Sequence, residues 1–192
     1  QTAQWQAHRT YPEQAFNSHD FTVYTENYHR HIHHELYRYA SYFIHDYWAD
    51  KHGIDIVGRI WRQALQPEDP IPSYMRITGI NVNQLNNEIY EAASHLVTWD
   101  LDSIRDLGED YIGRHTHKFT MQPNGSYLVA YDRCPGTTGY NVIPLELPTN
   151  GAQVSAGFKG LPNAAGFNTV DASRAGWRYG YVAVLENGTR VY

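Results

Sequence analysis

The 192-residue sequence contains a single cysteine, Cys134, which excludes a disulfide framework and a cysteine-based zinc site within the chain. It has no apolar run long enough to cross a bilayer, so no membrane-spanning segment is expected. Lysine and arginine are fewer than aspartate and glutamate, 15 against 20, which speaks against nucleic acid as a partner. The sequence shows no signal peptide and starts at Gln1, which we interpret as a processed or trimmed start.

Aromatic residues are the most distinctive feature of the composition. The chain holds 16 tyrosines and 5 tryptophans, within a composition that is 42% hydrophobic and 18% charged, as is typical of a globular protein. This aromatic content suits a surface that contacts carbohydrate or protein, and it suits an aromatic core equally well.

The hydrophobic pattern predicts an α+β fold in two domains. Residues 1–113 are expected to form a helical subdomain, with a polar, aromatic loop before Tyr28. Asn81 is a candidate N-cap, and Asp100 is expected to cap a short last helix. Helical periodicity is clearest in three segments, residues 36–48, 54–65 and 82–96.

Residues 114–192 alternate between apolar and polar residues and predict an antiparallel, β-sandwich-like domain. Asn124-Gly125 and Asn187-Gly188 are typical of hairpin turns. A loop rich in Gly, Ala and Asn is expected at 159–176, and the short strand after Gly188 suggests a domain truncated at its C-terminus. The other expected strands cover residues 140–147, 154–158 and 177–185.

Metal-ligand side chains are densest in the histidine segment, residues 28–35, which holds four histidines and a glutamate. His34-Glu35 begins like the zinc-protease helix motif His-Glu-x-x-His, which needs two histidines one turn apart. Arg38 stands where the second histidine is required, and a guanidinium does not ligate a metal. The most specific metal motif is therefore incomplete.

Three interpretations of this segment stay open. His31 and Glu35 lie one turn apart and chelate an ion if a helix begins by Tyr28. Alternatively, His29, His31 and His33 project from one side of an extended segment. Either arrangement supplies two or three ligands, whereas a closed zinc site needs four, so we expect no tight zinc or other cofactor on this chain alone. The third interpretation is a solvated helix start without a ligand.

A row of aromatic residues, Trp177, Tyr179 and Tyr181, is the second candidate site. It forms a sugar-stacking platform if its face is exposed, and the inner face of the β-sandwich if it is not. We favour the inner face, because Val182 and Val184 make the opposite side apolar as well.

Six segments are distinctive: Gln4-Trp5-Gln6, Tyr11-Pro12-Glu13-Gln14-Ala15-Phe16, Asn27-Tyr28-His29, Thr98-Trp99-Asp100-Leu101, Tyr140-Asn141-Val142-Ile143-Pro144-Leu145 and Gly176-Trp177-Arg178-Tyr179-Gly180. Over nearly the whole chain, they resemble the family of secreted bacterial and fungal proteins called domain of unknown function 6055. A second set in the helical part includes Tyr39-Ala40, Phe43, Tyr47-Trp48, Lys51 and Gly53. It is similar, more distantly, to the helical subdomain that follows the zinc motif in gluzincin-type metallopeptidases.

This resemblance implies the C-terminal portion of a secreted, cell-surface or periplasmic protein that acts on peptide or glycoprotein. The zinc motif, and the zinc itself, would then belong to an upstream domain of the full-length protein. His31, His34 and Tyr37 would face the catalytic cleft, and this chain alone would be inactive. The alternative is a non-catalytic module that binds glycan or protein.

Overall fold

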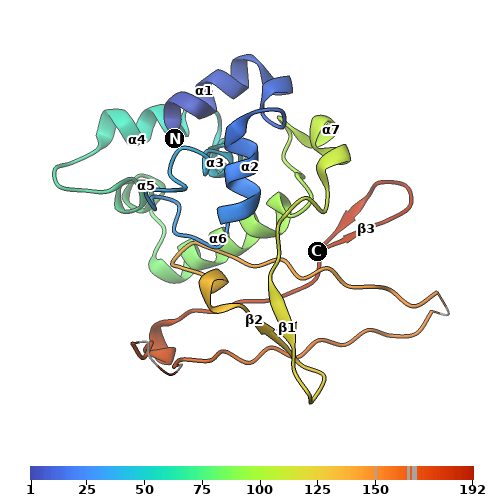
Figure 1. Ribbon diagram of the computed structural model, residues 1–192. Helices are drawn as coiled ribbons and strands as arrows, with labels where there is room; N and C mark the ends of the chain where they lie inside the picture. The colour runs from blue at the N-terminus through green and yellow to red at the C-terminus, as the bar shows by residue number, and fades with distance from the viewer. Residues whose placement is uncertain (150, 164, 166–167) are drawn as a thin grey trace.

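The computed structural model describes residues 1–149, 151–163, 165 and 168–192; residues 164, 166 and 167 of the expected loop 159–176 lie outside this description. Helices make up the first part of the chain and extended segments the last part (Figure 1). The α-helices of the described residues are α1 (Thr2–Thr10), α2 (His19–Asn27), α3 (Phe43–His52), α4 (Ile56–Gln63), α5 (Pro70–Thr78), α6 (Val82–Leu96) and α7 (Arg105–Gly108). Short 3-10 helices cover Pro12–Gln14, Glu109–Tyr111, Tyr131–Arg133 and Ala172–Arg174.

The core lies among these helices and is built mainly of aromatic rings. Trp99 is its centre, with ring centroids of Phe16, Phe21 and Phe43 between 5.2 and 5.3 Å away. His115, which follows α7, stacks on the Trp99 ring with centroids 5.0 Å apart. The largest fully buried side chains are Trp48, Trp99, Tyr24, Tyr42, Tyr74 and Phe43. Many of the aromatic residues therefore serve the core.

The start of α6 confirms the cap predicted at Asn81. Its side-chain oxygen accepts a hydrogen bond from Gln84 N at 3.0 Å, and the Gln84 side chain accepts one from Asn81 N at 2.9 Å. This reciprocal pair satisfies two amide groups that the first turn of a helix leaves free. Asp100, by contrast, caps no helix, because its carboxylate pairs with Arg105 and α7 begins only at that residue.

Two expectations around residues 18–42 are wrong. The expected loop contains α2, whose Ser18 cap accepts from Phe21 N at 3.3 Å, and whose β-branched residues hide the helical pattern. The helix expected from Leu36 begins only at Phe43, after a run of turns. Leu36 is accordingly 63% exposed.

The β-sandwich expected for residues 114–192 is also wrong. The described residues contain two small antiparallel sheets of two strands each: β1 (Phe119–Met121) with β2 (Tyr127–Val129), and β3 (Ala183–Val184) with β4 (Arg190–Val191). Both predicted hairpin turns connect these pairs, with Thr120 opposite Leu128 and Val184 opposite Arg190.

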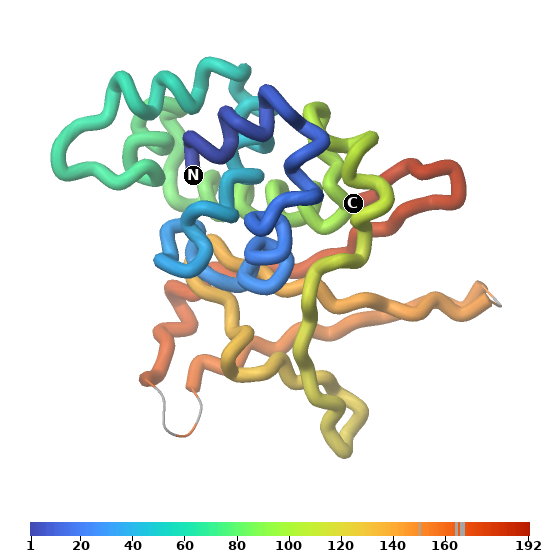
Figure 2. Tube along the Cα trace, turned by 45° about the horizontal axis from the view of Figure 1, so that its top comes forward, coloured from blue at the N-terminus to red at the C-terminus, as the bar shows by residue number. Residues whose placement is uncertain are grey.

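Apart from β3, at the end of the expected strand 177–185, the other expected strands are extended but join no ladder in the described residues. They run below the helical part as one loose layer (Figures 1 and 2), which we call the extended layer, residues 140–149, 151–161 and 177–185. Pro144 and Pro148 each lack the amide hydrogen that a ladder needs. Alternation in the sequence shows which residues share a face, but it does not show that a second sheet covers that face.

Among the residues that the structure describes, no helix combines the length and apolarity needed to span a membrane. The division into two domains at residue 113 stays a prediction.

Candidate functional site

The histidine segment, residues 28–35, runs through turns between the end of α2 and the start of α3. Turn-type backbone hydrogen bonds of 2.8 Å join His34 N to His31 O and Tyr37 N to His34 O. A helix that begins by Tyr28 is therefore not formed, and the His31–Glu35 pair loses the geometry that chelation requires.

The ligand-type side chains of this segment point to different surroundings. His29 is buried and Glu35 is exposed. The rings of His31 and His33 pack edge to face, with centroids 5.2 Å apart, and His34 places Nε2 3.3 Å from an Arg30 nitrogen. In the described part of the chain, no three His, Cys, Asp or Glu side chains are grouped so that they hold a metal ion.

The three residues expected to face a cleft do not share one environment. His31 and His34 are partly buried, whereas Tyr37 is 3% exposed. The Tyr37 ring packs against Tyr24 in the core, with centroids 5.6 Å apart. In this structure Tyr37 therefore has no access to a ligand.

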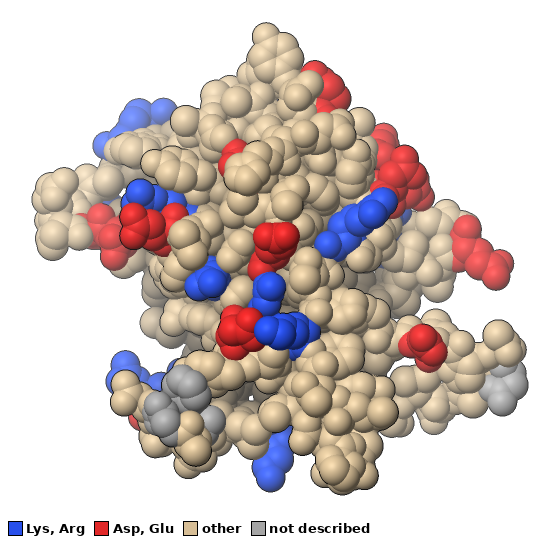
Figure 3. Space-filling view, in the orientation of Figure 1, with Lys and Arg blue, Asp and Glu red and all other residues tan. Residues whose placement is uncertain are grey.

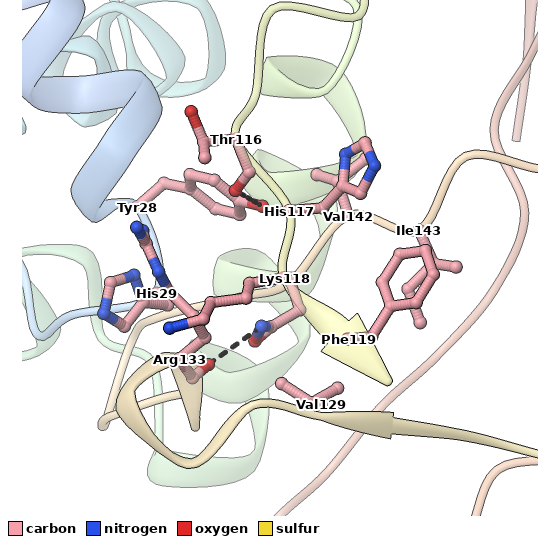
Figure 4. Close-up of a pocket in the computed structure, with 11 residues that line it drawn as sticks. Tyr28, His29, Thr116, His117, Lys118, Phe119, Val129, Arg133, Val142 and Ile143 are labelled. Atoms are coloured by element: carbon pink, nitrogen blue, oxygen red, sulfur yellow. Dashed lines mark hydrogen bonds between the residues drawn. The ribbon is translucent and has the colours of Figure 1, made fainter. Parts of the chain in front are cut away.

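His29 lines a small pocket between the end of α2 and the β1–β2 hairpin (Figure 4). Lys118 and Arg133 reach this pocket from two other segments, beside Asn141, whose side-chain amide donates to Arg133 O at 2.9 Å. The enclosed space is about 10 Å³, which is room for about one water molecule.

The charge of the pocket is largely compensated. Neither ring nitrogen of His29 makes a hydrogen bond to a described residue. Burial, together with the positive charges of Arg133 and Arg30, lowers the pKa of His29 to about 4. The imidazole is thus neutral at pH 7. Lys118 Nζ lies 2.9 Å from an Asp132 carboxylate oxygen. The size and charge of the pocket therefore suit a bound water rather than a substrate.

The segment 134–142 joins the extended layer to the end of α2. Gly136 N donates to His29 O at 2.8 Å, and Tyr140 N donates to Tyr28 O at 3.2 Å. The hydroxyls of Tyr24 and Tyr140 lie 2.8 Å apart beneath this contact. Gly139 makes the approach possible, because a Cβ at this position would lie 1.9 Å from His29 O.

We expect Gly139→Ala to lower the free energy of unfolding by about 1–3 kcal/mol, because a backbone oxygen has no rotamer with which to relieve the clash. Urea unfolding measures the loss. Gly157→Ala is the matched control, since a Cβ there meets no atom within 4 Å, and it should change stability by less than about 0.5 kcal/mol. Equal midpoints for the two variants would show that segment 134–142 does not dock on α2.

The extended layer carries an aromatic surface, formed by Phe158, Trp177, Tyr179 and Tyr181. Their side chains are 49%, 38%, 61% and 47% exposed. The Phe158 ring stacks on Tyr179 at 5.4 Å and packs edge to face on Trp177 at 6.0 Å. The face that we expected inside a sandwich is therefore open to solvent.

Side-chain contacts place the two segments of this surface antiparallel. Phe158 lies between Trp177 and Tyr179, and Tyr181 accepts a hydrogen bond from Ala156 N at 2.6 Å. A Cβ at Gly160 would lie 2.1 Å from the Trp177 ring, so this glycine lets the indole lie flat against the neighbouring segment.

The opposite face of segment 176–181 packs on α6. Arg178 Nε donates to Asn87 Oδ1 at 2.9 Å, and a Cβ at Gly180 would lie 1.9 Å from the Tyr90 hydroxyl oxygen. Because side chains alternate along an extended segment, this contact turns Trp177 and Tyr179 away from the helices.

Sequence reasoning missed the residues that complete these sites. Arg133 and Lys118 lie about a hundred residues from His29 along the chain. No local sequence pattern predicts that the three line one pocket. Phe158 was expected in a strand of its own. The spacing of Ala156, Phe158 and Gly160, two residues apart, indicated that they share one face of an extended segment. The packing of Phe158 on Trp177 is a tertiary contact, which this spacing does not predict.

Comparison with known proteins gives one family. The model described as "Family of unknown function (DUF6055)" matches residues 1–192. No curated protein and no solved structure matches the chain significantly. Because the match spans the whole chain, the protein belongs to the family of unknown function DUF6055.

Proposed function

We propose that this protein is a non-catalytic binding module that holds an uncharged glycan on its aromatic surface. The observation that carries the proposal is the exposure of four neighbouring rings on one face of the extended layer. Exposed apolar patches on soluble proteins commonly mark interaction sites, and aromatic rings give large contact area with polar edges.

The surroundings of the surface favour an uncharged partner. In the sequence of residues 151–185 the charged residues are Lys159, Asp171, Arg174 and Arg178, and Arg178 is turned toward α6. The extended layer is mostly uncharged on the face seen in Figure 3. Sugar rings present C–H groups to an aromatic face and hydroxyls to its rim, so a neutral polysaccharide matches this composition. A secreted, cell-surface or periplasmic location is part of the same proposal.

The relation to metallopeptidases stays a separate prediction. It concerns the full-length protein, and its test is the sequence upstream of Gln1. An intact His-Glu-x-x-His helix there supports a zinc peptidase, and its absence would remove that hypothesis.

Alanine at Trp177 or Tyr179 is expected to weaken glycan binding at least tenfold, since each substitution removes one stacking ring, worth about 1.4 kcal/mol or more. Affinity electrophoresis through gels that contain neutral polysaccharides of different linkage, followed by calorimetry on the best binder, measures the change. Trp61→Ala is the matched control, because Trp61 lies on α4 and is 70% exposed.

Two results would contradict the proposal. One is that none of the polysaccharides retards the protein. The other is that Trp61→Ala weakens binding as much as Trp177→Ala does. Retention by a protein ligand that Trp177→Ala abolishes, without any glycan binding, would instead assign the surface to a protein partner.

A further inference from the structure

A second cavity lies on the helical side, where α1, α3 and the loop before α7 meet. Its volume is about 240 Å³, and it is lined by His8, Arg9, Tyr42, Asp46 and Ser103, among others. This is near the lower end of ligand pockets, which usually measure about 300–1,000 Å³. The cavity therefore has room for a small molecule, in contrast to the pocket beside His29.

Asp46 is the buried acid of this cavity. Its side chain is 4% exposed, and Oδ1 accepts from Trp5 Nε1 at 2.9 Å and from Ser103 Oγ at 3.0 Å. Oδ2 receives no hydrogen bond from the described residues, so one oxygen of the carboxylate is unused. Burial raises the pKa of Asp46 to about 6, and the carboxylate is still ionised at pH 7.

Two nitrogen-bearing side chains of α1 face the same space. Arg9 places Nη1 3.6 Å from Asp46 Oδ1, which is longer than the ~2.8 Å of a hydrogen-bonded ion pair. The His8 ring stacks on Tyr42, with centroids 4.6 Å apart, and its buried Nδ1 has no hydrogen-bond partner among the residues that the structure describes. The wall thus combines an anion, a cation and an unpaired ring nitrogen.

A purely structural role accounts for part of this arrangement. Asp46 ties α1, through Trp5, to the loop that holds Ser103, and a buried carboxylate needs such partners. That role accounts neither for the open space nor for the unused Asp46 oxygen and the unpaired His8 nitrogen. The buried, unpaired Nδ1 of His8 is costly, and a ligand that bonds to it and to the free Asp46 oxygen would relieve that cost.

We propose that this cavity binds a free α-amino acid, with the ammonium group on Asp46 and the carboxylate on Arg9 and His8. The cavity offers one negative and one positive group close together, which matches a small zwitterion. A simple amine would leave Arg9 and His8 unpaired, and a simple carboxylate would meet the charge of Asp46. This site is independent of the aromatic surface.

The experiment screens the twenty common amino acids against the full 192-residue chain by thermal shift, followed by calorimetry on those that stabilise it. We expect at least one to bind with a dissociation constant below ~1 mM, whereas methylammonium and acetate do not bind. In the unmodified protein, the Trp5 indole N–H resonance should shift on binding, because it donates to Asp46.

Substitutions distinguish ligand binding by Asp46 from its structural role in joining α1 to the loop that holds Ser103. Asp46→Asn keeps an oxygen for Trp5 and Ser103 but removes the charge, and it should weaken binding at least tenfold. Arg9→Met should do the same, and Arg62→Met, on the exposed side of α4, should leave affinity within twofold. The proposal is overturned if no amino acid binds, if acetate or methylammonium binds equally well, or if Asp46→Asn retains the affinity. The Trp5 resonance answers the question even where a variant fails to fold.

Discussion

Replacing Trp99 by alanine is expected to lower the free energy of unfolding by about 3–5 kcal/mol, the largest loss from any single substitution considered for this protein. Trp99 is fully buried, and its ring touches the rings of Phe16, Phe21, Phe43 and His115. Alanine removes these contacts and leaves a cavity. It also removes the indole donor to Tyr111 O, at 3.0 Å.

Urea unfolding followed by circular dichroism measures this effect. Trp99→Phe should lower the free energy of unfolding by less than Trp99→Ala does, because the phenyl ring still fills part of the space that the indole occupies. Trp61→Ala, at a 70% exposed position, removes only the exposed hydrogen bond from Trp61 Nε1 to Thr2 Oγ1, at 3.0 Å, and should lower the free energy of unfolding by no more than about 1 kcal/mol. A Trp99→Ala variant as stable as Trp61→Ala would mean that the core is not centred on Trp99.

Acidification is expected to destabilise the protein strongly, through His45 and His115. Burial lowers the pKa of each to about 3. In the unfolded chain each takes up a proton below pH ~6.5, so the unfolded state binds more protons than the folded state. The stabilisation is complete above pH ~6.5 and is lost as the pH falls toward 3. As the pH falls from 6.5 to 4.5, each histidine lowers the free energy of unfolding by about 2–3 kcal/mol.

Asp46 acts in the opposite direction. Its raised pKa, about 6, means that the folded state holds this proton more tightly than the unfolded state does. The destabilisation by Asp46 therefore grows as the pH rises from ~3.8 to ~6 and is relieved in acid. The effect of Asp46 offsets part of the loss of unfolding free energy caused by one histidine, so acid still destabilises the protein overall.

Substitution of the two histidines tests the pH dependence. Within the described part of the chain, neither ring nitrogen of His45 has a hydrogen-bond partner. His45→Phe should therefore be tolerated at pH 7 and should flatten the loss of stability between pH 6.5 and 4.5. His115→Phe should do likewise, after a small loss of the contact with the Tyr140 hydroxyl. His19→Gln, at an exposed position, is the control. An unchanged pH slope in both phenylalanine variants would contradict the prediction.

Elements set by local chemistry could be predicted from the sequence. The Asn81 cap and the two Asn-Gly hairpin turns each depend on a few neighbouring residues. The strands of the expected sandwich depended instead on partners far along the chain, and those partners did not form a second sheet. Alternation alone was consistent with both outcomes.

The same limit applies to the sites. The composition of the histidine segment indicated a metal site, but turns between α2 and α3 place its rings in different surroundings. Asp46 could not be predicted as a site residue, because a lone aspartate in an amphipathic helix resembles a solvent-facing residue. Its importance comes from Trp5 and Ser103, which lie 41 and 57 residues away. For Trp177 and Tyr179 the sequence left a platform and the inner face of a sandwich open, and we favoured the inner face; the extended layer shows that their face is exposed.

The contact between the Tyr24 and Tyr140 hydroxyls joins residues 116 positions apart. The α-helices of the described residues end at Gly108. Most of the contacts among them join elements that follow one another along the chain, so they close loops of low entropic cost. During synthesis the helices can therefore assemble before Tyr140 leaves the ribosome. The order of events follows from this separation: segment 134–142 closes over Tyr24 and His29 only after the helices have been made.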